Sequence, residues 1–208
     1  MSRTSWFQNP VWSEGAEKHF REKLRRARNK SQPLRIQASC LCRTYPEVSL
    51  RLLEEYFSLP DRRQDSAACQ HRAEALLTLG RVPDAINAYL QAIERETDLG
   101  AVQTEARRDF SFLVATRRLR EHYQRALSVL GRADLLFPVQ RFTHHASIAM
   151  ISADCGDQQS AREHAESALK VAAATTSGLR YHSGLGLVGE DFEHAKKILA
   201  AILSAHRT

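Results

Sequence analysis

The stretch Ala73–Thr97, AEALLTLGRVPDAINAYLQAIERET, carries the clearest fold signal in this chain. Its apolar residues recur every three or four positions on each side of a short turn, which is the period of an α-helix rather than that of a strand. Gly80 provides a left-handed helix cap, and Pro83 suits the first turn of the next helix. Two helices joined by so short a turn lie antiparallel, so the stretch predicts a helical hairpin.

The same pattern returns before and after this stretch. The small residue near the start of each second helix marks the repeat, and these markers are Ser49, Ala85, Ala126 and Ala161. They follow one another at 36, 41 and 35 residues, which is within the range of helical repeat proteins. The other periodic segments also have the helical period, and none alternates as a strand does. The sequence therefore predicts an all-α chain with about four hairpins.

The quoted stretch resembles a tetratricopeptide repeat. The residues that carry the resemblance are small or large in the order of that family: Ala73, Leu76, Gly80, Ala85, Tyr89 and Ala92. Equivalent positions recur as Tyr123, Ala126, Leu130, Ala133 and Pro138, as Ala149, Gly156, Ala161, Ala165 and Ala168, and more weakly as Ser49, Leu53 and Tyr56. The whole chain is also similar to uncharacterised bacterial tetratricopeptide proteins of this length. The resemblance implies a right-handed α-solenoid of degenerate repeats.

We expect a single domain over residues 1–208. The four hairpins are predicted to cover residues 31–174, with one helix in residues 13–30 and another in residues 190–206 capping the ends of the array. A Gly-containing loop, residues 175–189, joins the last hairpin to the final helix. A chain of 208 residues buries enough surface for one core without metal or disulfide support.

Composition places the chain among ordinary globular proteins. Hydrophobic residues make up 43% and charged residues 26%, close to the averages for that class. Met1–Pro10 lacks the apolar region of a secretory signal, and no segment approaches the roughly 18 apolar residues of a membrane span. We therefore expect a cytoplasmic protein without a membrane partner. In that compartment its four cysteines should remain thiols: Cys40, Cys42, Cys69 and Cys155.

No motif predicts catalysis. Gly184–Gly189 has G-x-G-x-x-G spacing, but the nucleotide-binding fingerprint needs a strand before it, and none is predicted. His144 and His145 are adjacent on a predicted helix, so they point about 100° apart and cannot easily share a metal. We expect no enzyme activity, no cofactor and no metal. A site assembled only by the fold, and a role for the loop Gly178 to Gly189, stay open.

The family resemblance implies a concave groove lined by the first helices of successive hairpins, which binds an extended peptide or a partner helix. Placing this sequence on the repeat puts the following residues on that face: Leu34, Ala38, Leu41, Gln70, Glu74, Leu77, Arg108, Ser111, Ala115, Arg118, Thr143, Ala146 and Met150. Arg108 and Arg118, if they share one helix, are about 15 Å apart along its axis. We therefore expect a protein or peptide partner with an acidic and hydrophobic segment; the oligomeric state stays open.

A basic stretch offers an alternative. Residues 18–35 contain eight lysines and arginines and one glutamate, a charge of +7, whereas the whole chain carries +6, so the rest sums to −1. On a helix, its stripe follows spacings of three and four: Lys18, Arg21, Arg25 and Arg28. Such a stripe could grip the phosphates of a nucleic acid, but stacking aromatic residues are not interleaved with it, which makes this class less favoured than a protein partner.

Overall fold

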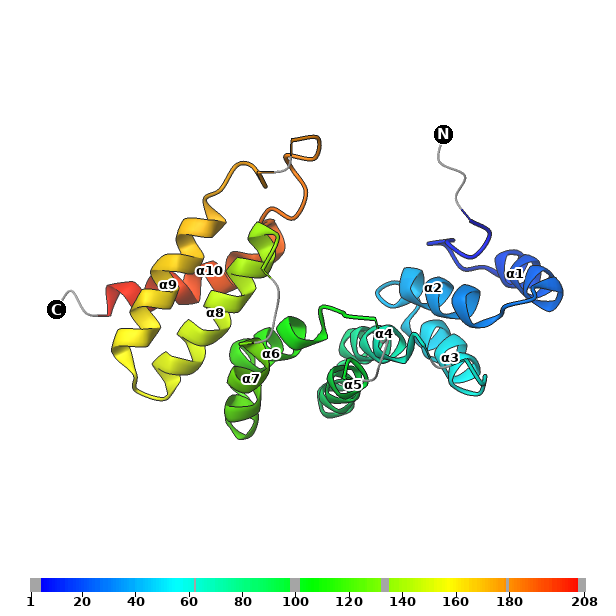
Figure 1. The fold of residues 1–208 in the computed structure, drawn as a ribbon, viewed down its shortest axis with the longest axis horizontal. Coiled ribbons are helices and arrows are strands. Elements are labelled where there is room, and N and C mark those ends of the chain that lie inside the picture. The colour runs from blue at the N-terminus through cyan, green and yellow to red at the C-terminus, as the bar shows by residue number, and fades with distance from the viewer. Residues whose placement is uncertain (1–4, 62, 98–101, 132–134, 179, 206–208) are drawn as a thin grey trace. The chain divides into compact units, whose positions relative to one another are not determined.

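The computed structural model describes residues 5–61, 63–97, 102–131, 135–178 and 180–205. These residues form helices, turns and loops, and no strand occurs among them, so the prediction of an all-α protein is confirmed (Figure 1). The chain divides into two compact units, Met1–Ala106 and Arg107–Thr208. A continuous right-handed solenoid, and the relation to tetratricopeptide repeats, stay predictions.

The first unit contains five helices in its described residues: α1 (Glu14–Arg26), α2 (Ser31–Leu41), α3 (Pro46–Phe57), α4 (Asp65–Thr78) and α5 (Val82–Arg95). Helix α2 packs against α3, and α4 packs against both α3 and α5. The quoted stretch thus forms the hairpin α4–α5. Between them Gly80 has a left-handed backbone with φ of +73°, and the Arg81 amide donates to the Leu76 carbonyl at 2.9 Å, which closes the helix end as expected.

The helix ends near the N-terminus follow local capping rules. The Ser13 side chain accepts a hydrogen bond from the Ala16 amide at 3.2 Å, so the predicted start of α1 is confirmed. Its end is earlier than expected: the backbone of Ala27 is extended, with ψ of 131°. The Asn29 side chain accepts from the Ser31 amide at 2.9 Å and helps to start α2. The predicted helix over residues 13–30 is therefore corrected to Glu14–Arg26, and Arg28 lies outside it.

Apolar side chains from successive helices of the first unit form one buried cluster: Phe20, Leu24, Leu34, Ala38, Leu41, Leu52, Leu53, Tyr56 and Ala68. The rings of Trp6 and Trp12 lie against Phe20, with centroids 5.4 and 5.6 Å away. The repeat marker Ser49 is fully buried and donates its hydroxyl proton to the Ala38 carbonyl at 2.9 Å. A small side chain at this position lets α3 approach α2 closely enough for that bond.

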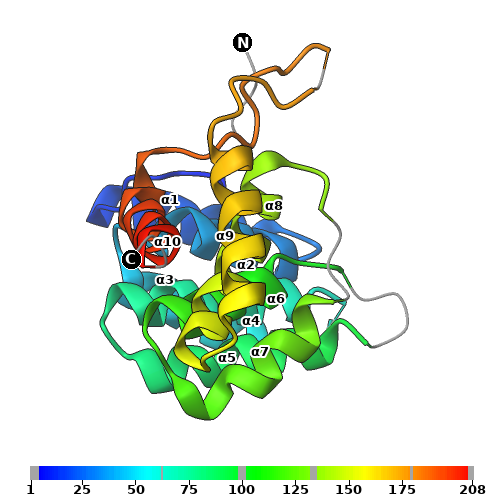
Figure 2. The same cartoon turned by 90° about the vertical axis from the view of Figure 1, so that its left-hand side faces the viewer.

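The second unit begins within α6 (Ala106–Thr116) and continues with η1 (Arg120–His122), α7 (Tyr123–Leu130), α8 (Pro138–Asp154), α9 (Gln158–Ala172), η2 (Glu190–Phe192) and α10 (Glu193–Ser204). Helices α8 and α9 form a hairpin, and α10 packs against both of them (Figure 2). Helix α7 ends at Leu130, and residues 132–134 lie outside the described part. The final helix is a 3₁₀ turn followed by α10.

A buried hydrogen bond and a group of aromatic rings join helices of the second unit. The buried Ser111 hydroxyl donates to the Ala126 carbonyl at 3.0 Å, which joins α6 to α7. The ring of Phe192 lies against Phe112 and Phe142, with centroids 5.6 and 5.3 Å away. The turn η2 therefore anchors the start of α10 to α6 and α8.

Candidate interaction surface

The residues predicted to line the groove are largely buried in the first unit. Leu34, Ala38 and Leu41 belong to the core cluster of that unit, and each is at most 2% exposed. Gln70 is also buried, whereas Glu74 and Leu77 are half-buried. The assignment of the three α2 residues to an open groove is corrected, because the side of α2 that carries them packs with α1 and α3 in the core.

The residues of the second unit that were predicted to line the groove also differ in exposure, and most of them are buried. Buried side chains predominate among them: Arg108, Ser111, Ala115, Ala146 and Met150. Thr143 is half-buried. Arg118 is exposed, but it follows the end of α6 and has a left-handed backbone with φ of +52°. The expectation that Arg108 and Arg118 present their charges from one helix is therefore corrected.

A polar network that the sequence did not predict joins the first helices α2 and α4. On α4, Gln70 donates to Glu74 at 3.1 Å, and the Cys42 thiol after α2 donates to the same carboxylate at 3.3 Å. Arg35 of α2 donates through Nε to Gln64 at 2.5 Å, and its Nη1 lies 3.2 Å from His71 Nε2. The i, i+4 spacing of Gln70 and Glu74 was the only sequence signal for this network. Arg35 and Cys42 lie on α2 or directly after it, and local spacing does not reveal such contacts between helices.

The network supports binding of polar groups rather than nucleophilic chemistry. Burial, followed by the charge of Glu74, raises the pKa of Cys42 to about 12, so the thiol stays protonated near neutral pH. Burial acts to raise the pKa of Glu74, but the neighbouring His71 and Cys42 outweigh it and the pKa is lowered. Glu74 is therefore an anion that accepts hydrogen bonds at the edge of the surface formed by α2 and α4, which we call the first-helix face.

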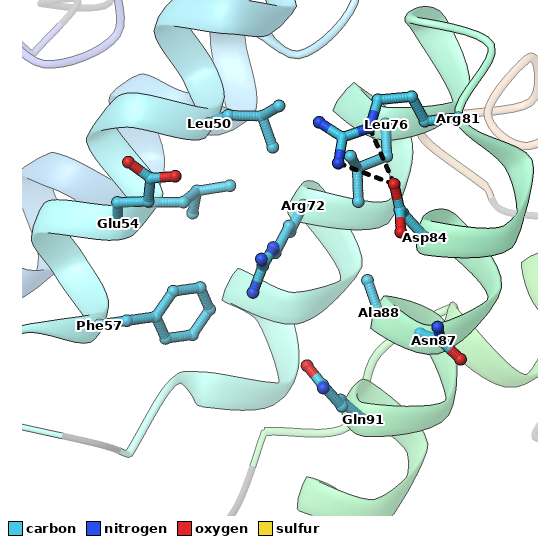
Figure 3. A pocket seen from close by; sticks show the side chains of 11 residues that line it. Leu50, Glu54, Phe57, Arg72, Leu76, Arg81, Asp84, Asn87, Ala88 and Gln91 are labelled. Carbon is cyan, nitrogen blue, oxygen red and sulfur yellow. Dashed lines mark hydrogen bonds and ion pairs between the residues drawn. The ribbon is translucent and has the colours of Figure 1, made fainter.

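A concave pocket of about 290 Å³ lies between α3 and α5 and over α4 (Figure 3). We call it the α3–α5 pocket. Apolar side chains make up part of its lining: Leu50, Leu53, Phe57, Leu76 and Ala88. Polar side chains complete it: Glu54, Arg72, Arg81, Asp84, Asn87 and Gln91. Six of the eleven lining residues are therefore polar or charged.

The charges of this pocket differ in their partners. Arg81 forms an ion pair with Asp84 at 2.7 Å. Arg72 points toward Phe57, with its guanidinium carbon 5.9 Å from the ring centroid, and forms no ion pair within the described residues (Figure 3). Glu54 forms none there either. The pocket therefore offers one cation and one anion to a ligand, and the sequence missed it because its lining comes from three helices.

The basic stripe is only partly retained. Lys18 and Arg25 are exposed on α1, and Arg28 is exposed beyond its end. None of these three forms an ion pair with another described residue, whereas Arg21 pairs with Glu55 at 2.5 Å and with Glu17 at 3.5 Å. Three cations remain available, and Arg21 holds α1 against α3.

The remaining motifs have structural explanations. Gly186 has φ of +70°, and a Cβ atom there would lie 2.7 Å from the Phe137 Cβ, so its place in Gly184–Gly189 reflects packing onto the start of α8. Across the described ranges, no group of three or more His, Cys, Asp or Glu residues is placed to hold a metal. No helix in this part of the chain is both long and apolar enough to cross a membrane.

Comparisons with family models, with curated proteins and with solved structures gave no match to this chain.

Proposed function

We propose that this protein is an interaction module that binds a peptide or a partner helix, and that the α3–α5 pocket receives the ligand's side chains. The observation that carries the proposal is the concave, partly apolar surface formed by Leu50, Phe57 and Leu76 and bordered by polar groups. A volume of about 290 Å³ suits one or two side chains rather than a large cofactor. The proposal includes the predicted cytoplasmic location.

The charges of the pocket support a particular kind of ligand. Because Arg72 has no ion pair among the described residues and lies over Phe57, a carboxylate beside an apolar side chain would gain a partner there. A charge-assisted hydrogen bond to arginine is stronger than a neutral one. This agrees with the expected acidic and hydrophobic segment, but on the α3–α5 side rather than on the first-helix face.

A peptide selection tests the proposal. Peptides of about 12 residues would be selected on the protein from a random library, and their affinities measured by fluorescence anisotropy. Asn87 is exposed and lines the pocket, so Asn87→Trp should fill it and weaken binding at least about tenfold. Thr78→Trp, at an exposed residue of α4 outside the pocket lining, is the matched control and should bind normally.

Two other outcomes of this selection would contradict the proposal. Peptides that lose affinity only with Thr78→Trp would favour the first-helix face near Glu74 instead. A selection that yields no peptide with saturable binding would argue against an interaction module of this kind.

Phosphate binding by α1 is the second candidate, because Lys18, Arg25 and Arg28 are exposed without ion pairs in the described part. Single-stranded RNA is the probe, and its affinity should fall steeply with salt. Reversal of all three residues to Glu should abolish binding. An equal charge change at the exposed residues Arg125, Lys170 and Lys197 is the control; equal losses in both variants would indicate nonspecific attraction only.

A further inference from the structure

Two histidines of the second unit face each other across the α8–α9 hairpin. His145 of α8 and His164 of α9 have their Nδ1 atoms 2.9 Å apart. Their ring centroids are 5.1 Å apart and the rings are inclined by 38°. Both side chains are half-buried, so the pair has access to solvent. The two residues are distant enough in sequence that no local motif reveals the pair.

The short distance between two like nitrogens constrains their protonation. One Nδ1 must carry a proton and donate it, while the other accepts with its lone pair. The lone pair that accepts this hydrogen bond is also the group through which an imidazole binds a metal ion.

The ring positions also match those of two imidazoles on one ion. With Zn–N bonds of about 2.0–2.1 Å and tetrahedral angles, the two nitrogens lie about 3.3 Å apart and the ring centroids about 5.2 Å apart. The observed centroid separation is 5.1 Å. Zinc binding would separate the two Nδ1 atoms by about 0.4 Å from the observed contact.

We propose that His145 and His164 form a two-histidine binding site for Zn²⁺ through their Nδ1 atoms. On binding, the ring that carried its proton on Nδ1 becomes the Nε2–H tautomer by exchange with water. Both Nδ1 lone pairs then face the ion, and the two rings remain neutral. The ring of His144 lies 5.3 Å from that of His145, but among the described residues no group of three or more His, Cys, Asp or Glu is arranged to hold a metal, so water completes the coordination in the isolated chain. Two protein ligands, against the three or four of usual zinc sites, predict weak binding.

Zinc titration by isothermal calorimetry tests this site. Cys155 is exposed and thiolates bind zinc, so the parent protein would be Cys155→Ser, kept reduced with a non-chelating phosphine. We expect one Zn²⁺ per chain. His145→Gln and His164→Gln should each weaken binding at least about tenfold. His194→Gln removes an exposed histidine of α10 and should leave the affinity unchanged.

A second measurement covers the case in which a histidine variant fails to fold. In the folded parent protein, Zn²⁺ should first shift the imidazole nitrogen signals of His145 and His164 in NMR spectra, while Mg²⁺ should shift neither. Equal zinc affinity in the parent, His145→Gln and His194→Gln proteins would overturn the proposal. So would first shifts at other histidines, or the absence of saturable zinc binding up to about 1 mM.

Discussion

Three tyrosines provide a graded test of the packing described above. Tyr56 is 1% exposed and donates its hydroxyl proton to Asp65 at 3.1 Å. Tyr123 is 7% exposed and donates to Asp154 at 2.9 Å. Tyr181 is 82% exposed. Changing each to Phe removes the same oxygen, so differences in unfolding free energy should report the value of each hydroxyl in its surroundings.

The expected magnitudes follow from the partners. Tyr56→Phe leaves the buried Asp65 carboxyl with one donor fewer, and a hydrogen bond to a charged group contributes about 1.5–3 kcal/mol. Asp154 keeps two hydrogen bonds from Arg120, at 2.7 and 3.0 Å, when Tyr123 is changed. Tyr123→Phe should therefore cost less, about 0.5–1.5 kcal/mol. Tyr181→Phe should change stability by less than about 0.5 kcal/mol.

Urea unfolding followed by far-UV circular dichroism would give the three free energies, with the slope of each transition compared to confirm the same unfolding reaction. The order of destabilisation should be Tyr56, then Tyr123, then Tyr181. If Tyr56→Phe were no more destabilising than Tyr181→Phe, the buried contact between α3 and α4 through Asp65 would be refuted. Equal effects of Tyr56→Phe and Tyr123→Phe would contradict the compensation by Arg120.

Three further predictions address the core, the glycine loop and the thiols. Ala85 and Ala126 are fully buried repeat markers, so Ala85→Leu and Ala126→Leu should each lower the free energy of unfolding by about 1–3 kcal/mol through overpacking. Ala200→Leu, at an exposed residue of α10, is the control and should not lower it. Equal melting temperatures of the three variants would refute the close helix contacts. Gly186→Ala should lower the melting temperature, because the backbone of Gly186 is left-handed and a Cβ atom there would meet Phe137. Gly184→Ala is the control and should be tolerated, because a Cβ atom at Gly184 meets no atom within 4 Å. Equal effects would contradict the packing of the loop on α8. Burial raises the pKa of Cys42 to about 12, so at pH 8 this thiol should react with iodoacetamide far more slowly than the exposed Cys155. Mass spectrometry of tryptic peptides would measure both rates. Comparable rates would show that Cys42 is accessible.

The sequence predicted the helices well where the signal is local. Gly80 and Pro83 each act within a few residues of their own position, and α4 ends and α5 begins beside them. Helix formation and capping depend on contacts within about one turn, so one sequence carries that information. The end of α1 was missed because the extended backbone at Ala27 has no comparable local signal.

The accessible surface was predicted poorly for a physical reason. The repeat pattern assigned Leu34, Ala38 and Arg108 to an open face, but exposure depends on which other elements cover a helix, and all three are buried. Periodicity identifies an apolar face without identifying what packs on it.

From the amino-acid sequence alone, the all-α class, the hairpin of α4 and α5, and the small buried positions at Ser49 and Ala85 followed, because period and turn chemistry are written in neighbouring residues. Only the tertiary structure decided which side chains meet. It brought Arg72 over Phe57 from another helix and His145 against His164 across a hairpin. Such contacts depend on the axial position and rotation at which two helices pack, and side chains from both helices determine these together.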